Sequence, residues 1–187
     1  MIPPFPSSST FASLLVLGGA RSGKSHYVQA LAEQAARHPH LIATAEAKDD
    51  EMRDRILRHR EERHTRWRVS EVPLALCAAL EVYAAPEVLL VVDCLTLWLS
   101  NLMMADETLD THIKELVTLV PHLAGPVVFV SNEVGLGIVP DNAMARHFRD
   151  AQGRLNQRLA TQCEAVVLVC AGIPQLIKPS QRPLITF

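Results

Sequence analysis

The stretch Gly18-Gly19-Ala20-Arg21-Ser22-Gly23-Lys24-Ser25 carries the strongest structural signal in this chain. It fits the pattern G-x-x-x-x-G-K-[ST], and it lies between a short apolar run at residues 14–17 and a helix-forming segment at residues 24–37. The glycines allow the backbone to curl so that N–H groups point at phosphate oxygens, and the following helix adds the positive end of its dipole. The stretch therefore predicts a strand, a phosphate-binding loop and a helix, in that order.

Two side chains of this loop have expected roles toward a bound nucleotide. Lys24 is predicted to reach the β- and γ-phosphates, which makes it a candidate catalytic residue, and the Ser25 hydroxyl is predicted to ligate Mg²⁺. Asp93 ends a run of consecutive valines and leucines, and an acid at such a strand end can hold Mg²⁺ directly or through water. Asp93 also suits the N-cap of a helix that starts near Leu95, and the two roles are compatible.

The rest of the chain alternates between buried-strand and helix patterns. Because strands separated by helices need crossover connections, we expect a three-layer α/β fold of the P-loop NTPase type, with a mostly parallel sheet and ligands at the carboxyl ends of its strands. The Pro- and Ser-rich residues 1–12 are expected to form a disordered leader, and residues 13–187 a single domain. The expected later strands are residues 40–44, 87–93, 126–132 and 165–171, and the expected later helices are residues 49–63, 74–83, 95–103, 108–123 and 142–161.

Bulk properties exclude several classes of partner. The net charge of −2 gives no broad cationic surface for a nucleic-acid polymer or an anionic membrane. No run reaches the roughly 18 apolar residues of a membrane span, and the amino terminus lacks the cationic segment of a signal peptide, so we expect a cytoplasmic protein. The four cysteines form no C-x-x-C pair and each lies in or beside an apolar run, which favours reduced structural thiols at Cys77, Cys94, Cys163 and Cys170.

The segment at residues 49–63 is too charged to belong to a core. Helical spacing places Arg55, His59 and Arg63 on one face, and a basic stripe that contains a histidine can meet phosphates. Neighbouring arginines disfavour protonation of His59, and a neutral imidazole is what a nucleophile needs. The alternative interpretation is a solvated helix face with Glu/Arg pairs.

The segment at residues 131–140 follows a predicted buried strand, so its polar and glycine residues are expected at the ligand edge of the sheet. Glu133 is a candidate general base for a substrate hydroxyl or an outer-shell group for Mg²⁺, and its alternative role is the cap of a turn. The predicted helix that follows carries Arg146, Arg149 and Arg154, more cations than a packing helix needs, and their role stays open at this point.

The combination of these motifs resembles the bifunctional adenosylcobinamide kinase / adenosylcobinamide-phosphate guanylyltransferase family over residues 14–178. A phosphate-binding loop alone is shared by many enzymes, but the loop together with the Arg58-His59-Arg60 helix and the residues 132–140 loop is far more specific. The motifs that carry the resemblance are residues 18–25, 42–45, 50–52, 55–63, Trp67-Arg68 with Glu71, residues 93–96 and residues 131–142.

The resemblance implies two reactions of cobalamin biosynthesis: phosphorylation of the aminopropanol hydroxyl of adenosylcobinamide by ATP or GTP, and then GMP transfer from GTP to give adenosylcobinamide-GDP. It further implies Mg²⁺ with the nucleotide, a homo-oligomer, commonly a trimer, and a covalent GMP–histidine intermediate. The histidine that matches the family pattern is His59, with His64 as a nearby competitor. The implied nucleotide contacts are residues 18–25, Ala43, Thr44, Ala45, Arg60, Glu61, Glu62, Arg63, Glu71 and Asp93.

Two other functions fit the residues. The first is a simple P-loop small-molecule kinase, in which His59 is only an exposed helix residue and no guanylyl group is transferred. The second is a nucleotide-binding regulatory module, whose bound nucleotide changes an interface with a partner. Covalent labelling by the α-phosphate of GTP distinguishes both from a guanylyltransferase.

Overall fold

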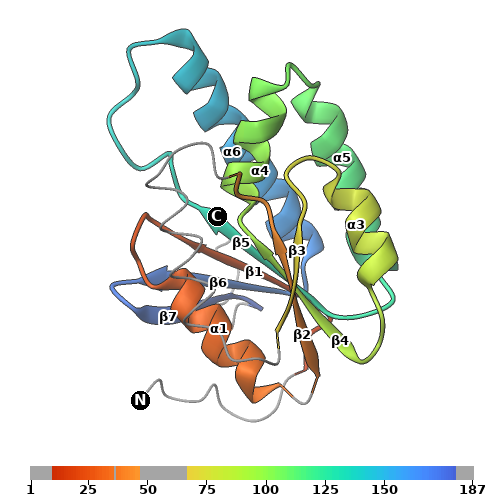
Figure 1. Cartoon of the computed structure of the whole chain (residues 1–187). Helices are drawn as coiled ribbons and strands as arrows, with labels where there is room; N and C mark the ends of the chain where they lie inside the picture. Colours follow the sequence, from red (N-terminus) through yellow and green to blue (C-terminus); the bar gives the residue numbers. More distant parts are fainter. Residues whose placement is uncertain (1–9, 36, 47–66, 180–187) are drawn as a thin grey trace, which may run out of the picture.

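The computed structural model describes residues 10–35, 37–46 and 67–179 (Figure 1). Within these ranges, seven strands form one sheet in the order β3-β2-β4-β5-β1-β6-β7, and every neighbouring pair is parallel except β6 and β7. The expected α/β fold with a mostly parallel sheet is confirmed. The strands are β1 (Ser13–Gly18), β2 (His38–Ala43), β3 (Arg68–Glu71), β4 (Val88–Asp93), β5 (Val127–Asn132), β6 (Ala165–Cys170) and β7 (Ile173–Lys178). The helices are α1 (Lys24–Gln34), α3 (Leu76–Tyr83), α4 (Leu95–Met104), α5 (Leu109–Leu119) and α6 (Ala143–Gln162), with one 3₁₀ turn, η1 (Val120–His122).

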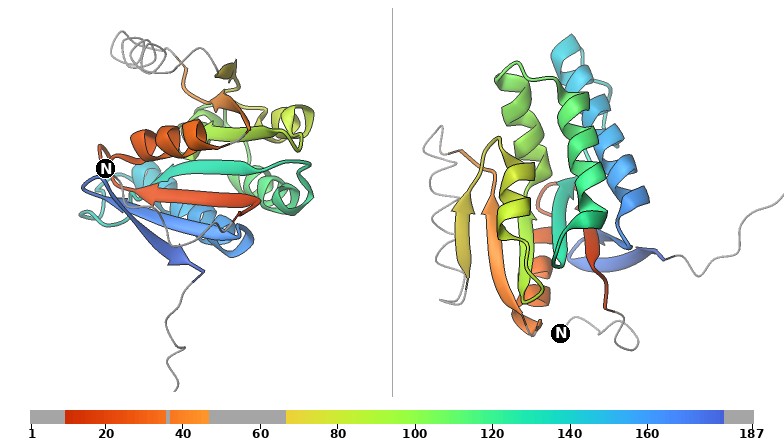
Figure 2. Two further views of the ribbon diagram at one scale, coloured as in Figure 1. Left: turned by 90° about the horizontal axis from the view of Figure 1, so that it is seen from below. Right: turned by 90° about the vertical axis from the view of Figure 1, so that its right-hand side faces the viewer.

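The central strands are mostly apolar because helices cover both faces of the sheet (Figure 2). Successive side chains of a strand point to opposite faces. Leu15 and Phe129 therefore pack into the core beneath α3, α4, α5 and α6. Val16 and Val128 pack on the other face, against Val28 of α1. This three-layer arrangement leaves the two ends of the sheet accessible, and the carboxyl end receives the phosphate-binding loop.

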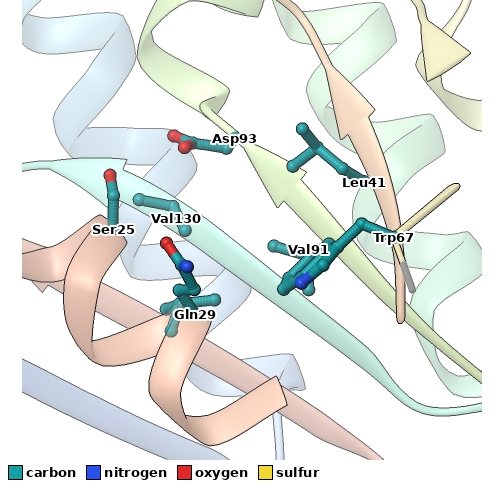
Figure 3. A pocket seen from close by; sticks show the side chains of 8 residues that line it. Ser25, Gln29, Leu41, Trp67, Val91, Asp93 and Val130 are labelled. Atoms are coloured by element: carbon teal, nitrogen blue, oxygen red, sulfur yellow. The ribbon is translucent and has the colours of Figure 1, made fainter. Parts of the chain in front are cut away.

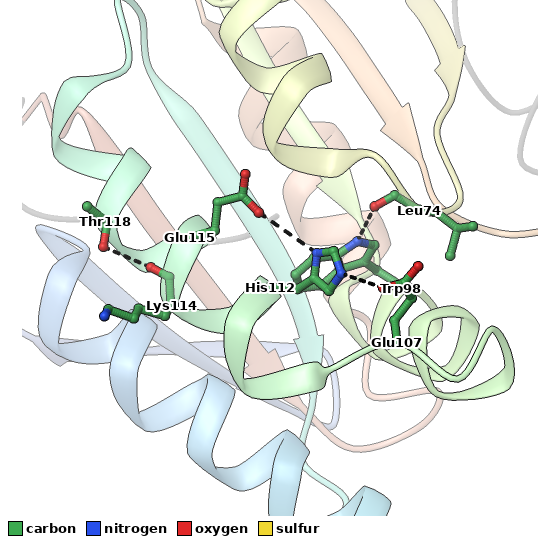
Figure 4. A network of polar contacts seen from close by, with 7 residues as sticks. All are labelled: Leu74, Trp98, Glu107, His112, Lys114, Glu115 and Thr118. Atoms are coloured by element: carbon green, nitrogen blue, oxygen red, sulfur yellow. Dashed lines mark hydrogen bonds and ion pairs between the residues drawn. The ribbon is translucent and has the colours of Figure 1, made fainter.

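Trp98 of α4 contacts neighbouring elements on the face of the sheet that α3, α4, α5 and α6 cover (Figure 4). Its fully buried indole donates from Nε1 to the carbonyl oxygen of Leu74 at 2.9 Å, just before α3. The ring of His112 on α5 meets the indole edge-on, with centroids 6.5 Å apart. The imidazole in turn lies 3.2 Å from Glu107 Oε2 and 3.8 Å from Glu115 Oε2. One buried aromatic side chain thus connects α3, α4 and α5.

The two edge strands, β3 and β7, are findings that the sequence pattern did not predict. Both are mostly exposed, so neither shows the continuous apolar run of the central strands. The expected helix at residues 108–123 is also divided: α5 ends at Leu119 and η1 follows, because Pro121 has no N–H to donate to a helical ladder. The expected helix at residues 49–63 lies outside the described residues. In the part of the chain that is described, no helix is long and apolar enough to span a membrane.

Three of the four cysteines behave as expected, and one does not. Cys77, Cys94 and Cys163 are buried free thiols, and burial raises the pKa of both Cys77 and Cys163 to about 12. Such thiols are poor nucleophiles because the reactive species is the thiolate. Cys170 is free but exposed, because it occupies the last position of β6, where the strand emerges from the core.

His40 on β2 holds the edge of the sheet to the helix layer. The residue is buried, its Nε2 atom lies 2.9 Å from Ser70 Oγ on β3, and its ring centroid lies 4.5 Å from that of Tyr83 on α3. Burial lowers the pKa of His40 below its ordinary value of 6.5, and the charge of Arg68 lowers it further. The folded chain therefore favours a neutral imidazole at this position.

We expect the stabilisation from neutral His40 to be lost on acidification. Since the pKa of His40 is lower in the folded chain than in the unfolded chain, the unfolded chain binds the proton more readily. The contribution is complete above the unfolded value of 6.5 and declines as the pH falls through that value toward the folded pKa. In urea unfolding, the free energy of unfolding of wild type should exceed that of His40→Gln by an amount that shrinks as the pH falls. His122→Gln, which changes an exposed histidine, serves as control. A difference that is constant with pH would contradict this account.

Candidate active site

The phosphate-binding loop, residues 18–25, is held in shape by close contact with the turn between β6 and β7. A Cβ atom at Gly18 would lie 2.5 Å from the carbonyl oxygen of Val169 and 2.6 Å from Ser22 Oγ, so no side chain fits there. Gly23 has φ 98°, a conformation that favours glycine, and a Cβ atom there would lie 3.1 Å from Cα of Gly172. The Gly172 amide donates to the carbonyl oxygen of Ser22 at 2.8 Å. The two glycines of the motif are therefore required by packing as well as by ligand access.

Lys24 lies under this loop rather than in solvent. Its side chain is buried, and Nζ donates to the carbonyl oxygen of Gly19 at 2.6 Å. Helix α1 begins at Lys24, and its N-cap, Gly23, contributes no side-chain hydrogen bond. A helix start capped by glycine suits an anion, because the first-turn amides and the helix dipole both favour negative charge. The ammonium group and the start of the helix thus converge at the loop, and the role of Lys24 toward a phosphate stays a prediction.

Strand register brings several of the expected nucleotide contacts to one edge of the sheet. Ala43, Glu71 and Asp93 occupy the same level on the neighbouring strands β2, β3 and β4. Gly18 pairs with Asn132 at the ends of β1 and β5, and β5 lies between β4 and β1. Because these strands are parallel, all five residues lie at carboxyl ends, where ligands of such sheets bind.

Ser25 and Asp93, the two expected Mg²⁺ ligands, line the same hollow (Figure 3). Ser25 comes from the first turn of α1, and Asp93 from the end of β4. Gln29 and Trp67 line this hollow as well, although the sequence analysis assigned neither of them to a site. Gln29 could have been found from its spacing, since residues four apart share a helix face. Trp67 was named only among the motifs of the family resemblance, and no strand pattern placed it at this edge because it precedes the unpredicted strand β3.

Thr44, an expected nucleotide contact, uses its polar atoms within the protein. Its buried Oγ1 donates to the carbonyl oxygen of Cys94 at 2.7 Å and accepts from the Cys94 amide at 2.9 Å. Its backbone amide donates to the carbonyl oxygen of Asp93 at 3.2 Å, and its own carbonyl oxygen accepts from Asn101 Nδ2 at 2.8 Å. Thr44 therefore fixes the junction of β4 and α4, and with it the position of Asp93.

Glu133 lies beside the phosphate-binding loop and is held by a buried polar cluster. Its amide donates to the carbonyl oxygen of Gly18 at 3.0 Å, and its Oε1 accepts from Asn156 Nδ2 at 3.3 Å. The oxygen of the same Asn156 amide accepts from Ser131 Oγ at 2.6 Å and from Gln152 Nε2 at 3.1 Å. Gln152 Nε2 also donates to Ser131 Oγ at 2.9 Å. The cluster of Ser131, Gln152 and Asn156 thus fixes the end of β5 and the carboxylate that follows it.

Neither Gln152 nor Asn156 was predicted as part of the site. Both are buried on the face of α6 that also contains Ala151, Leu155 and Leu159. Two amide side chains four residues apart on an apolar helix face are a readable signal, because buried polar groups need partners.

The three arginines that the sequence singled out on α6, among the four that this helix carries, have partners within the chain. Arg146 donates from Nη1 to the carbonyl oxygens of Pro140 and Asp141 at 2.9 and 2.7 Å, so it fastens the loop that precedes the helix. Arg149 pairs with its neighbour Asp150, and Arg154 lies 4.0 Å from Asp110 on α5. The open question of their role is answered in part by these contacts within the chain.

His59, the expected nucleophile, lies outside the described residues. The same holds for its competitor His64 and for the expected nucleotide contacts Arg60, Glu61, Glu62 and Arg63. The described residues accordingly include the predicted phosphate-binding loop and the strand ends beside it, and all the assigned roles toward a nucleotide, including those of residues 59–64, stay predictions.

We expect Gly18→Ala to destabilise the fold, whereas Gly19→Ala should be nearly neutral. The added methyl group at Gly18 overlaps Val169 O and Ser22 Oγ, but a Cβ atom at Gly19 meets nothing described within 4 Å. Overpacking of this kind costs about 1–3 kcal/mol. Urea unfolding of both variants measures the effect, and equal stabilities would show that the close contact around Gly18 is unimportant.

We also expect Asn156→Leu to reduce stability by about 2 kcal/mol, because similar-sized leucine leaves the buried partners Ser131 and Gln152 without their shared acceptor. Gln157→Leu, on the exposed side of the same helix, is the matched control. The free energies of unfolding of the two variants measure how much the polar cluster stabilises the fold. If Asn156→Leu is as stable as Gln157→Leu, the cluster is not an important constraint on the end of β5.

The fold resembles that of a known ATPase. A chain of a prototypical ATPase from the type III secretion system of pathogenic bacteria superposes with a TM-score of 0.52 at 12% sequence identity, covering 84% of this chain. This chain spans half the length of that solved chain. At such low identity the likeness concerns the fold alone.

Sequence comparison identifies relatives over nearly the whole chain. The family model for cobinamide kinase / cobinamide phosphate guanyltransferase matches residues 14–177. The chain is 45% identical over 166 residues to the bifunctional adenosylcobalamin biosynthesis protein CobP of Pseudomonas aeruginosa, covering 88% of this chain and 96% of the relative. It is 39% identical over 180 residues to the corresponding CobU protein of Salmonella typhimurium, covering 88% of this chain and 99% of the relative. The chain therefore belongs to the cobinamide kinase / cobinamide phosphate guanyltransferase family.

Proposed function

We propose that this protein phosphorylates adenosylcobinamide with ATP or GTP and then transfers GMP from GTP to the phosphorylated product, giving adenosylcobinamide-GDP. Membership of the family supports both reactions. The observation that carries the proposal is the convergence of Lys24, Ser25, Asp93 and Glu133 at one edge of the sheet, around a loop shaped for phosphates. In line with the family resemblance, we also propose that the protein works in the cytoplasm as a homo-oligomer.

In the kinase reaction the loop binds the triphosphate. The Lys24 ammonium group exchanges its contact with the carbonyl oxygen of Gly19 for the β- and γ-phosphate oxygens, and the amides at the start of α1 bind the same oxygens. The oxygen of the substrate hydroxyl attacks the γ-phosphorus while Glu133 accepts the hydroxyl proton. The bond from that phosphorus to the β-phosphate oxygen breaks. The hydrogen bond from Asn156 to Glu133 supports this assignment because it orients the carboxylate.

The residues at this edge fit a magnesium ion. Hydroxyl and carboxylate oxygens, as found on Ser25 and Asp93, are the ligands that Mg²⁺ prefers. Among the described residues, no group of three or more His, Cys, Asp or Glu side chains is arranged to hold a metal. A nucleotide-bound Mg²⁺ takes one or two protein ligands and completes its shell with phosphates and water. When bound, the ion would neutralise charge on the phosphate oxygens.

In the guanylyl transfer we propose His59 as the nucleophile. A ring nitrogen of His59 forms a bond to the α-phosphorus of GTP, the bond to the β-phosphate oxygen breaks, and pyrophosphate leaves. A phosphate oxygen of adenosylcobinamide phosphate then attacks the same phosphorus, and the nitrogen–phosphorus bond breaks. Two successive displacements of this kind make one difficult transfer into two easier ones, and Arg60 and Arg63 stabilise the charged oxygens each time.

Incubation with Mg²⁺ and GTP labelled at the α-phosphorus, followed by denaturing electrophoresis, tests this proposal. Wild type and the control His64→Ala should carry label that is acid-labile and base-stable, whereas His59→Ala should carry none. Label that persists in His59→Ala but disappears in His64→Ala would move the nucleophile to His64. An unlabelled wild type that still consumes nucleotide in the presence of cobinamide would instead support a simple kinase.

A further inference from the structure

The loop between β5 and α6 exposes an unusual concentration of apolar side chains. We define the apolar loop as residues 134–140 together with Met144. Within it, Leu136 is 89% exposed, Ile138 98%, Val139 61% and Met144 64%. No charged residue occurs between Glu133 and Asp141. Single exposed apolar residues are common on protein surfaces, but a contiguous group of them marks a binding surface.

This exposure belongs to a loop that is fastened at both ends. At its start, the Glu133 amide donates to the carbonyl oxygen of Gly18 at 3.0 Å. At its end, Arg146 Nη1 binds the carbonyl oxygens of Pro140 and Asp141, and the Asn142 side chain accepts from the Ala145 amide at 2.7 Å. The apolar side chains are therefore presented from a fixed position rather than from a loose connection.

Two glycines in this loop have no function that the chain itself explains. Gly135 and Gly137 flank Leu136, and a Cβ atom at either position would meet nothing within 4 Å among the described residues. Neither has the left-handed backbone conformation that a side chain would strain. Glycine also occurs where a ligand must approach the backbone closely. The two positions are thus explained by a flat, bulky group that lies against the loop.

The location of the loop limits what that group is. Its start touches the phosphate-binding loop through Gly18, and it leaves the same edge of the sheet as the connection from β1 to α1 (Figure 1). A kinase acceptor must bring its hydroxyl to the γ-phosphate at this edge. In cobinamide that hydroxyl is on a short arm, and the rest of the molecule is a large macrocycle with methyl groups and neutral amides on its rim. The body of the acceptor must then lie just outside the edge, where the apolar loop is.

We propose that the apolar loop is the surface on which the corrin macrocycle of the acceptor rests, with Leu136 and Ile138 as its main contacts and Gly135 and Gly137 leaving room for the ring. This assignment rests on the proposed function. It gives the loop a role in selecting an uncharged, bulky acceptor, while Lys24 and the phosphate-binding loop select the nucleotide. Removing two exposed apolar contacts should then weaken acceptor binding without changing nucleotide binding.

Steady-state kinetics of the full chain with adenosylcobinamide and ATP tests the assignment. The double variant Leu136→Ser/Ile138→Ser should raise KM for adenosylcobinamide roughly tenfold or more, since each lost apolar contact weakens binding and about 1.4 kcal/mol corresponds to a factor of ten. The KM for ATP should stay at the wild-type value. Val82→Ser is the matched control, because Val82 is 73% exposed on α3, away from this edge. Gly135→Ala and Gly137→Ala should also raise KM for adenosylcobinamide, while their urea unfolding stays at or slightly above wild type.

Sedimentation of the same variants separates this assignment from its main competitor, a contact with a second copy of the chain. A double variant that changes oligomeric state and keeps the wild-type KM for adenosylcobinamide would overturn the proposal and assign the loop to subunit contact. The proposal would also be overturned if the double variant and wild type had the same KM for adenosylcobinamide and the same oligomeric state. If wild type itself neither binds nor phosphorylates adenosylcobinamide, the proposed function fails first, and this inference fails with it.

Discussion

The contact between the phosphate-binding loop and the β6–β7 turn is the constraint on which the site depends. Gly18 lies close to Val169, and Gly23 lies close to Gly172. The Gly172 amide donates a hydrogen bond to the carbonyl oxygen of Ser22. These contacts hold the loop against the end of β6 and the β6–β7 turn. Since β6 and β7 follow the loop by about 140 residues in a chain of 187, this contact requires that β6 has paired with β1.

A second set of interactions places acidic side chains around this loop. Thr44 binds both backbone groups of Cys94 and so fixes the end of β4, where Asp93 lies. The cluster of Ser131, Gln152 and Asn156 does the same for the end of β5, where Glu133 lies. Both sets use buried polar groups in a largely apolar core. Such groups are costly unless they are paired, and paired they specify one geometry. The site therefore owes its shape to residues that need not touch a ligand.

The sequence predicted those parts of this arrangement that are local. The loop at residues 18–25 is defined by one contiguous motif. The central strands could be predicted from their apolar runs because both of their faces are covered. The edge strands β3 and β7 have no such run, since they are largely exposed. The side-chain partner of Glu133, Asn156, follows it by 23 residues, and only the fold brings the two together. Cys170 lies in an apolar run and was expected to be a structural thiol, but it is exposed because it is the last residue of β6.

Calorimetric titration with Mg·GTP tests the central claim, that nucleotide binds at the phosphate-binding loop through Lys24. Wild type and Lys114→Ala, which changes an exposed lysine on α5, should bind with the same affinity. Lys24→Ala should lose most of that affinity, because a buried ammonium group aimed at the loop is removed. If Lys24→Ala remains folded and binds Mg·GTP as tightly as wild type, the nucleotide binds elsewhere and the account is wrong.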